Sequence, residues 1–222
     1  MEAVIKVGGS IAEKPAVLKK LGDKLGEIAE KHSIVVVPGG GKLADVVREL
    51  DQQYGLSADV AHKMAILGMD QFGLLLSQVI PNSCTTYSLS EAKTFSEGKS
   101  APIFLPSQLM FRENPLEASW DVTSDSIAAY FASQLNANML ILATDVDGIF
   151  ESDPKKQLDN RLLFKLSANE LLAFTQRSSV DLFLPKLLMK MRLDCYVVNG
   201  CYPERVAAIL SGQCDVCTLI KA

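Results

Sequence analysis

The chain has 222 residues, 48% of them apolar and 22% charged, and its 22 Lys and Arg against 26 Asp and Glu give a net charge of −4. This is the composition of a folded globular chain, and an acidic balance without a basic run argues against nucleic-acid binding. No apolar stretch approaches the ~18 residues of a membrane span and the N-terminus shows no signal-peptide pattern, so we expect a cytoplasmic protein without membrane contact.

Two short strands, each followed by glycines and a helix, are predicted at the start of the chain. Residues 3–7 are apolar and largely β-branched and stop at Gly8-Gly9-Ser10, which indicates a buried strand that ends in a tight turn. Apolar residues then recur at helical spacing over residues 15–31, with a proline near the first turn. A second apolar strand over residues 34–37 again ends in glycines, Gly39-Gly40-Gly41.

The rest of the chain continues this alternation. In chain order we predict helices over 42–54, 57–79 and 124–135, a strand over 139–143, a surface loop or hairpin over 148–163, a strand over 195–198, a helix over 203–210 and a strand over 216–220. Strands that alternate with helices are typical of a parallel sheet covered by helices. We therefore predict an α/β fold in a single domain over residues 1–222.

The two glycine clusters are candidate anion sites. In an open parallel sheet, ligands bind at the carboxyl ends of the strands. Glycines there let backbone N–H groups approach a phosphate closely, and the start of the following helix adds a favourable dipole. The alternative is that both clusters are only tight strand-to-helix turns. Neither cluster fits the Walker A or the GxGxxG pattern, so a different phosphate-binding scaffold is expected.

Lys6 is the charged residue of the first predicted strand. A buried lysine is rare because its ammonium group must lose water, so it needs a partner. Lys6 stands two residues before the glycine turn, where it could meet a phosphate. The alternative is a lysine whose ammonium group reaches solvent at a sheet edge.

Polar residues also follow a later strand and begin two helices. Thr144 and Asp145 stand directly after the strand predicted over 139–143. Asp125 lies in the first turn of the helix predicted over 124–135, where a role in helix capping explains it locally. Lys186 begins an apolar helix, where a cation is unfavourable, so we expect an anion near it.

Taken in order, these motifs resemble those of the amino acid kinase family. They are Lys6-Val7-Gly8-Gly9-Ser10, Pro38-Gly39-Gly40-Gly41, Ser124-Asp125, Thr144-Asp145-Val146-Asp147-Gly148-Ile149 and Pro185-Lys186. The resemblance implies a three-layer αβα sandwich around a mainly parallel sheet, with an acceptor lobe over about residues 1–140 and a nucleotide lobe over about residues 140–222. It also implies transfer of the ATP γ-phosphoryl group, with Mg²⁺, to a small-molecule oxygen, in a homo-oligomer.

The resemblance assigns a role to each motif residue by position. Lys6 and Lys186 would flank the transferred phosphoryl group, with Asp125 orienting both lysines. The ATP phosphates would be held by Gly8, Gly9 and Ser10. The nucleotide pocket would be lined by Thr144, Asp145, Gly148 and Phe150, and the acceptor side by Gly40 and Gly41. Many members carry glycines just before the second lysine, whereas this chain has Val180-Asp181-Leu182-Phe183-Leu184-Pro185.

Two segments indicate the class of acceptor. Residues 62–67 and 119–125 resemble the small family members that convert an (aminomethyl)furanylmethyl phosphate to its diphosphate. The resemblance suggests that Trp120 packs on the furan ring or the ammonium group and that Asp121 pairs with the ammonium group. A core aromatic is the alternative for Trp120. Isopentenyl phosphate, UMP and acylamino-acid carboxylates stay open as acceptors, and a non-catalytic nucleotide-binding subunit is the alternative of another class.

Other polar residues are not ranked by the sequence. His62 and Met64 lie in a helical apolar pattern that is more typical of a core or an interface. Cations that could bind the acceptor phosphate outside the motifs are Arg48, Lys63, Lys93 and Arg112.

The five cysteines are an odd number in a chain of this length, which favours a reduced protein. Cys214 and Cys217 form one CxxC pattern without a matching second pair. We therefore interpret them as buried apolar cysteines rather than zinc ligands, and we predict no protein-bound metal site.

Overall fold

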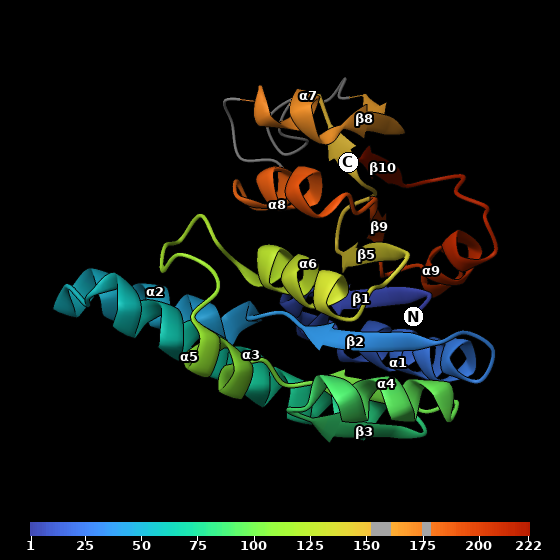
Figure 1. Cartoon of the computed structure of the whole chain (residues 1–222), viewed down its shortest axis with the longest axis horizontal. Helices are drawn as coiled ribbons and strands as arrows, with labels where there is room; N and C mark the ends of the chain where they lie inside the picture. Colours follow the sequence, from blue (N-terminus) through green and yellow to red (C-terminus); the bar gives the residue numbers. More distant parts are fainter. Residues whose placement is uncertain (152–160, 175–178) are drawn as a thin grey trace.

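The computed structural model describes residues 1–151, 161–174 and 179–222, and within them the centre is an eight-stranded sheet (Figure 1). The strand order is β3-β4-β2-β1-β5-β9-β10-β8, and every neighbouring pair is parallel except β9 and β10. The strands are β1 (Ala3–Val7), β2 (Ile34–Pro38), β3 (Ser83–Thr86), β4 (Ala101–Phe104), β5 (Met139–Thr144), β8 (Lys165–Ser167), β9 (Cys195–Asn199) and β10 (Thr218–Lys221). A separate antiparallel pair is formed by β6 (Ile149–Phe150) and β7 (Leu162–Leu163).

Helices cover both faces of the sheet, so the predicted three-layer αβα sandwich around a mainly parallel sheet is confirmed (Figure 1). The helices are α1 (Pro15–Ala29), α2 (Gly41–Tyr54), α3 (Ala58–Val79), α4 (Leu89–Glu97), α5 (Ser107–Glu113), α6 (Ser124–Gln134), α7 (Ala168–Leu172), α8 (Leu184–Met191) and α9 (Pro203–Leu210), and a short 3-10 helix η1 spans Gly9–Glu13. One core layer contains α1, α9 and the second half of α3, and the other contains α4, α6 and α8.

The alternation of side chains along β1 decides where Lys6 points. Val4 belongs to the core layer with α6, whereas Ala3, Ile5 and Val7 belong to the layer with α1. Successive strand residues face opposite sides of a sheet. Lys6 therefore shares the side of Val4 and faces α6.

Most predicted elements are confirmed with small shifts of their ends. Residues 3–7 and 203–210 form the strand β1 and the helix α9 with the predicted bounds. The last strand begins at Thr218 rather than at Val216. The sequence predicts no element from β3 to α5. For β3 the reason is that its Ser-Cys-Thr-Thr sequence lacks the apolar signal of a buried strand.

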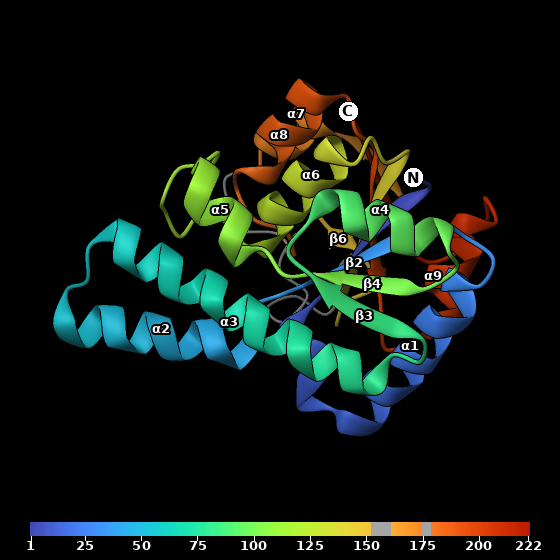
Figure 2. The same ribbon diagram turned by 60° about the horizontal axis from the view of Figure 1, so that its bottom comes forward.

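The helices α2 and α3 form a hairpin that projects from the body of the molecule (Figure 2). Gly55 ends α2 in a left-handed conformation with a φ of 62°, which glycine adopts without steric cost. Ser57 then caps α3, because its hydroxyl oxygen accepts a hydrogen bond from the Val60 N–H. The hairpin starts directly after the second glycine cluster, so its base lies at the end of the sheet where a ligand is expected.

The expectation that the cysteines are all reduced is wrong at one pair. Cys214 and Cys217 form a disulfide with their Cα atoms 6.0 Å apart. The turn before β10 brings the two side chains together, within the Cα distance that a disulfide requires. Cys214 is exposed and Cys217 is buried, so the interpretation as two apolar cysteines is also wrong.

The two ends of the segment predicted as a surface loop or hairpin over 148–163 pair as antiparallel strands, β6 with β7, which agrees with the hairpin alternative. Pro154, Lys155 and Lys156 of that stretch lie outside the described residues. Within the described part of the chain, no helix is long and apolar enough to span a membrane.

Candidate active site

The two glycine clusters touch each other at the carboxyl ends of β1 and β2. A Cβ atom on Gly9 would lie 2.2 Å from the Gly41 Cα atom, and Gly41 itself has a φ of +52°. Neither position has room for a side chain, and Gly41 adopts a conformation that favours glycine. The clusters therefore form one continuous floor rather than two independent turns.

Backbone N–H groups of this floor divide into two sets. The N–H groups of Gly8 and Gly39 extend the sheet, since they donate to the carbonyl oxygens of Ala143 (2.7 Å) and Val7 (2.8 Å). Gly9 and Ser10 begin η1, and Gly41 begins α2. N–H groups at the start of a helix have no acceptor within the helix, so these can donate to an anion.

Lys6 and Asp125 form a buried ion pair beside this floor. The Lys6 Nζ atom lies 2.7 Å from the Asp125 Oδ1 atom, and the side chains are only 11% and 9% exposed. Asp125 is in the first turn of α6, whose N-cap is Thr123. Thr123, and not Asp125, therefore caps this helix. The Asp125 carboxylate instead compensates the charge of Lys6.

Asp181 connects this ion pair to the start of α8. Its backbone N–H donates to the Asp125 Oδ2 atom over 3.2 Å. Its carboxylate accepts six hydrogen bonds of 2.6–3.2 Å, from the N–H and hydroxyl groups of Thr123 and Ser126 and from the N–H groups of Phe183 and Leu184. Burial, and next the charge of Asp125, raise the pKa of the Asp181 carboxyl group. The stretch that departs from the family's glycines thus holds the first turns of α6 and α8 together.

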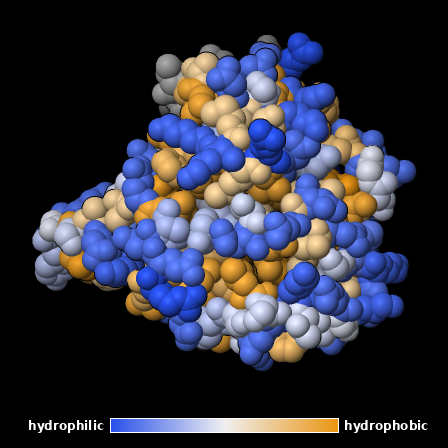
Figure 3. Space-filling view, in the orientation of Figure 1, coloured by the Kyte–Doolittle hydropathy of each residue, from blue (hydrophilic) through white to orange (hydrophobic). Residues whose placement is uncertain are grey.

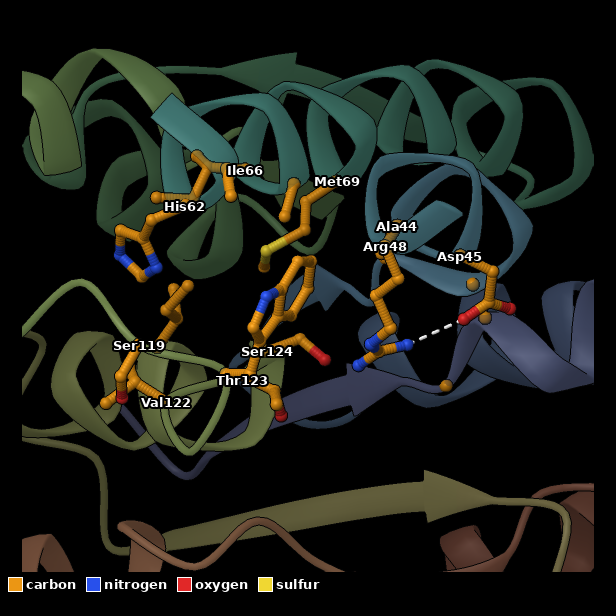
Figure 4. A pocket seen from close by; sticks show the side chains of 18 of the residues that line it. Ala44, Asp45, Arg48, His62, Ile66, Met69, Ser119, Val122, Thr123 and Ser124 are labelled. Atoms are coloured by element: carbon orange, nitrogen blue, oxygen red, sulfur yellow. Dashed lines mark hydrogen bonds and ion pairs between the residues drawn. The ribbon is translucent and has the colours of Figure 1, made fainter. Parts of the chain in front are cut away.

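A cavity of about 370 Å³ begins at the glycine floor and continues along the α2–α3 hairpin (Figure 4). In Figure 4, His62, Ile66 and Met69 enter it from α3, and Thr123 and Ser124 from the opposite side. The predicted site residues that line it are Lys6, Gly8, Gly9, Ser10, Gly40, Gly41, Trp120 and Thr144. A second cavity of about 180 Å³ shares Trp120 and Thr123 with the first and is also lined by Asp125 and Asp181.

Trp120 is a half-buried wall of both cavities rather than a core aromatic. Its Nε1–H donates to the Asp51 Oδ2 atom over 2.8 Å. The Arg48 guanidinium group lies over the indole ring, 4.8 Å from the centroid, and also pairs with Asp45 at 2.6 Å. Asp121, by contrast, is exposed and does not line either cavity.

The residues predicted for the nucleotide pocket are only partly brought to the cavity. Thr144 lines it, whereas Asp145 is exposed and does not line it, and Gly148 packs against the Thr218 hydroxyl group. Thr218 also accepts the Ile149 N–H over 2.8 Å, which fixes the start of the β6–β7 hairpin that contains Phe150.

Lys186 is exposed on α8 and does not line the large cavity. Its Nζ atom lies 5.7 Å from the centroid of the Phe183 ring. Within the described residues, the structure thus pairs Asp125 with Lys6 and not with Lys186. The hydrogen bonds of Asp181 nevertheless fix the helix that carries Lys186 against the helix that carries Asp125.

Sequence reasoning missed two polar residues of the cavity. His62 lines it, although its pattern favoured a core or an interface, and its Nε2 atom is buried without a hydrogen-bond partner in the described part of the chain. Burial lowers the pKa of His62. Asp51 also lines the cavity. The signal that could have found it is its helical spacing from Gly41, Ala44 and Arg48, which places all four on one face of α2.

Of the cations that the sequence left unranked, the structure brings Arg48 to the cavity. Lys63 pairs with Asp59 and Arg112 with Glu113 on exposed helix surfaces. The cavity is not lined by Lys63, Arg112 or Lys93.

Comparison with known proteins identifies the family. The model of the amino acid kinase family matches residues 1–199. The chain is 36% identical to the [5-(aminomethyl)furan-3-yl]methyl phosphate kinase of Methanocaldococcus jannaschii, over 98% of this chain and 96% of the relative. It is 28% identical to the uridylate kinase of Methanococcoides burtonii, over 95% of this chain and 91% of the relative.

Solved structures show the same fold. The uridylate kinase of Archaeoglobus fulgidus superposes with a TM-score of 0.79 at 22% identity, covering 99% of this chain and 100% of the other. The isopentenyl phosphate kinase of T. acidophilum, solved as a product complex, superposes with a TM-score of 0.67 at 19% identity, covering 100% of both chains. The chain belongs to the amino acid kinase family.

Proposed function

We propose that this member of the amino acid kinase family transfers the γ-phosphoryl group of ATP to [5-(aminomethyl)furan-3-yl]methyl phosphate and forms its diphosphate, a step of methanofuran-type cofactor synthesis. The identity of 36% over nearly the whole length, to a relative named for this acceptor, supports the assignment. UMP and isopentenyl phosphate, which the names of other relatives and neighbours specify, are the alternative acceptors.

The observation that carries phosphoryl transfer is the Lys6–Asp125 ion pair beside the glycine floor. Phosphoryl transfer requires positioning and stabilisation of charge on the phosphoryl oxygens more than it requires a covalent nucleophile. Lys6 would neutralise part of that charge, and Asp125 would keep the ammonium group in place. A protein that only binds nucleotides does not need a cation held in this way at the point of transfer.

The backbone floor would hold the reacting phosphates. We assign the N–H groups of Gly9 and Ser10 to the ATP phosphates and that of Gly41 to the acceptor side, because each begins a helix and faces the cavity. Gly8 and Gly40 would act by leaving room, since a Cβ atom on Gly8 would lie 2.9 Å from the Ala143 carbonyl oxygen and one on Gly40 2.6 Å from the Ala44 Cβ atom.

The nucleotide would lie toward β5 and α8. Thr144, at the carboxyl end of β5, lines the cavity, and we assign Asp145, Gly148 and Phe150 beyond it to the nucleotide pocket. Lys186 would reach the transferred phosphoryl group from α8. Within the described residues, no three His, Cys, Asp or Glu side chains are grouped to hold a metal ion. Mg²⁺ would therefore enter with ATP, held mainly by phosphate oxygens and water.

Three further properties belong to the same proposal. The acceptor lobe would comprise about residues 1–140 and the nucleotide lobe about residues 140–222. The protein would act in the cytoplasm. It would form a homo-oligomer, which an exposed apolar stripe on α3 supports: Val60, Leu67 and Leu74 recur every seven residues and are 42%, 45% and 53% exposed.

ADP release from Mg-ATP tests the proposal. The acceptors compared are the furan phosphate, isopentenyl phosphate, UMP, acetylglutamate and carbamate. Turnover with the furan phosphate is expected, and a loss of about 10²- to 10³-fold in kcat is expected for Lys186→Ala. Lys190→Ala, which removes an exposed lysine from the same helix, is the matched control and should keep wild-type kcat.

The other outcomes separate the alternatives. Turnover with a different acceptor would keep the mechanism and overturn the acceptor. ATP binding without turnover of any acceptor would overturn the enzymatic assignment in favour of a non-catalytic nucleotide-binding subunit.

A further inference from the structure

The outer half of the large cavity carries polar groups that phosphoryl transfer does not use. Along α2, the lining residues are Gly41, Ala44, Asp45, Arg48 and Asp51, which follow one face of the helix. At a rise of 1.5 Å per residue, Asp51 lies about 15 Å along the helix axis from Gly41. Asp51 is therefore far from the glycine floor, where the phosphates would be held.

The packing of α3 on α2 places His62 at the same level. A Cβ atom on Gly68 would lie 3.0 Å from the Leu43 Cβ atom, which fixes the level at which the two antiparallel helices meet near the floor. From there, His62 and Asp51 are each about two helical turns further out, toward the turn of the hairpin. The outer end of the cavity is thus lined by Asp51 from α2 and by His62 from α3.

The charges along this wall are not balanced. Arg48 is compensated by Asp45, at 2.6 Å, and its guanidinium group also lies over Trp120. The Asp51 carboxylate accepts one hydrogen bond, from the Trp120 Nε1–H to Oδ2, and within the described residues it has no ion pair. Its second oxygen and the buried Nε2 atom of His62 are thus available at the end of the cavity opposite Lys6.

We propose that Asp51 recognises a cationic amine on the acceptor and so determines which phosphate compounds this enzyme accepts. This inference rests on the proposed function. With its phosphate at the glycine floor, the acceptor would direct its amine outward, where the amine donates a charge-assisted hydrogen bond to the free oxygen of Asp51. The ring between the two ends would lie against Trp120, Ile66 and Met69.

Position in the cavity favours Asp51 over Asp121 for this role. Asp51 lines the cavity and is half-buried, whereas Asp121 is exposed and lines neither cavity. A carboxylate–ammonium contact gains strength where part of the surrounding water is excluded. Isopentenyl phosphate has no amine, so Asp51 would discriminate against it.

The test compares two acceptors that differ only in the amine. They are [5-(aminomethyl)furan-3-yl]methyl phosphate and (5-methylfuran-3-yl)methyl phosphate. For the wild type we expect kcat/KM to be about 10- to 100-fold higher with the amine, the size of one charge-assisted hydrogen bond, with the difference mainly in KM. Asp51→Asn should lose most of this preference by weakening the aminated acceptor alone, because an asparagine oxygen can still accept the Trp120 hydrogen bond.

Glu49→Gln is the matched control. Glu49 is exposed on α2 and does not line the cavity, so this variant removes the same charge from the same helix and should keep the wild-type preference. Equal wild-type kcat/KM values for the two acceptors would overturn the inference without any variant. An equal loss on both acceptors in Asp51→Asn would also overturn it, since the damage would then be general.

Failure of the proposed function gives a different result. In that case the wild type converts neither furan phosphate but converts UMP or isopentenyl phosphate, and the inference fails with it. If the wild type converts both furan phosphates equally, the proposed reaction stands and only the role of Asp51 is overturned.

Discussion

His62 shows how burial changes the chemistry of a single residue. Its Nε2 atom is buried and, in the described part of the chain, has no hydrogen-bond partner, and burial lowers its pKa while the nearby charge of Asp59 opposes that shift. An imidazole in such a wall is neutral near pH 7. A neutral ring can lie beside both an acceptor amine and the Asp51 carboxylate without adding a positive charge.

This shift predicts a pH dependence of stability at the residue scale. The unfolded chain binds a proton at His62 near pH 6.5, whereas the folded chain binds it only at lower pH. The free energy of unfolding should therefore fall as the pH drops below about 6.5 and level off once the folded imidazole also protonates. Urea unfolding between pH 5 and pH 7.5 measures this slope, which His62→Gln should reduce.

The second histidine of the chain provides the control. His32 lies 2.7 Å from the Glu2 carboxylate, outside the cavity, and His32→Gln should leave the contribution of His62 in place. An unchanged slope in His62→Gln would contradict the prediction. Because the chain has only two histidines, an NMR titration of their ring protons can assign each pKa directly.

At the scale of elements, Asp181 connects α6 to α8 through hydrogen bonds. One carboxylate accepts from the first turns of both helices, and its backbone N–H reaches the carboxylate that pairs with Lys6. Donors at the start of a helix must otherwise be satisfied by water or left unpaired. The position of α8, and of the Lys186 side chain that it carries, therefore depends on a residue that lines only the smaller cavity.

Asp181→Asn should weaken the hydrogen-bonded contact between α6 and α8. An amide group directs two N–H donors toward groups that are themselves donors, so several hydrogen bonds are lost and the free energy of unfolding should fall by about 2–4 kcal/mol. Hydrogen exchange of the Phe183 and Leu184 amides should speed up, and kcat should fall with it. Asp23→Asn, on the exposed side of α1, is the control for the loss of one carboxylate. Unchanged hydrogen exchange at the Phe183 and Leu184 amides would contradict the role of Asp181 in connecting the two helices.

At the scale of the whole molecule, the projecting α2–α3 hairpin (Figure 2) lines the cavity and also carries exposed apolar residues. In the space-filling view of Figure 3, hydrophobic residues lie among hydrophilic ones on this projecting part of the molecule. Val60, Leu67 and Leu74 form an exposed stripe on α3, while His62, Ile66 and Met69 of the same helix line the cavity. A second copy packed on the stripe would shield this apolar surface from water and brace the wall that contains His62.

Charged substitutions on the stripe test this arrangement. Leu67→Lys and Leu74→Lys together should convert an oligomer into a monomer, because a buried unpaired ammonium group is costly at an interface. Sedimentation equilibrium measures the change in mass. Gln53→Lys, on the exposed surface of α2, should keep the oligomer. A monomeric wild type, or an oligomer that survives both lysines, would contradict the role of the stripe.

The local features of this protein follow from its amino-acid sequence alone. Hydrophobic periodicity predicts the strands β1 and β2 and the helix α9, and the conformations that glycine permits predict the turns after the two strands. Both signals act over only a few residues. The motif order also indicated the family, which the comparisons confirm, and it indicated most of the glycine floor.

Which of the candidate side chains come into contact depends on how the helices and strands pack together. Asp125 joins Lys6 because α6 packs on the side of β1 to which Lys6 points, and Asp51 rather than Asp121 lines the cavity because α2 turns that face inward. The pairing of Cys214 with Cys217 likewise depends on the shape of one turn. Such contacts depend on how elements distant in sequence pack together, and a local pattern of residues does not contain that information.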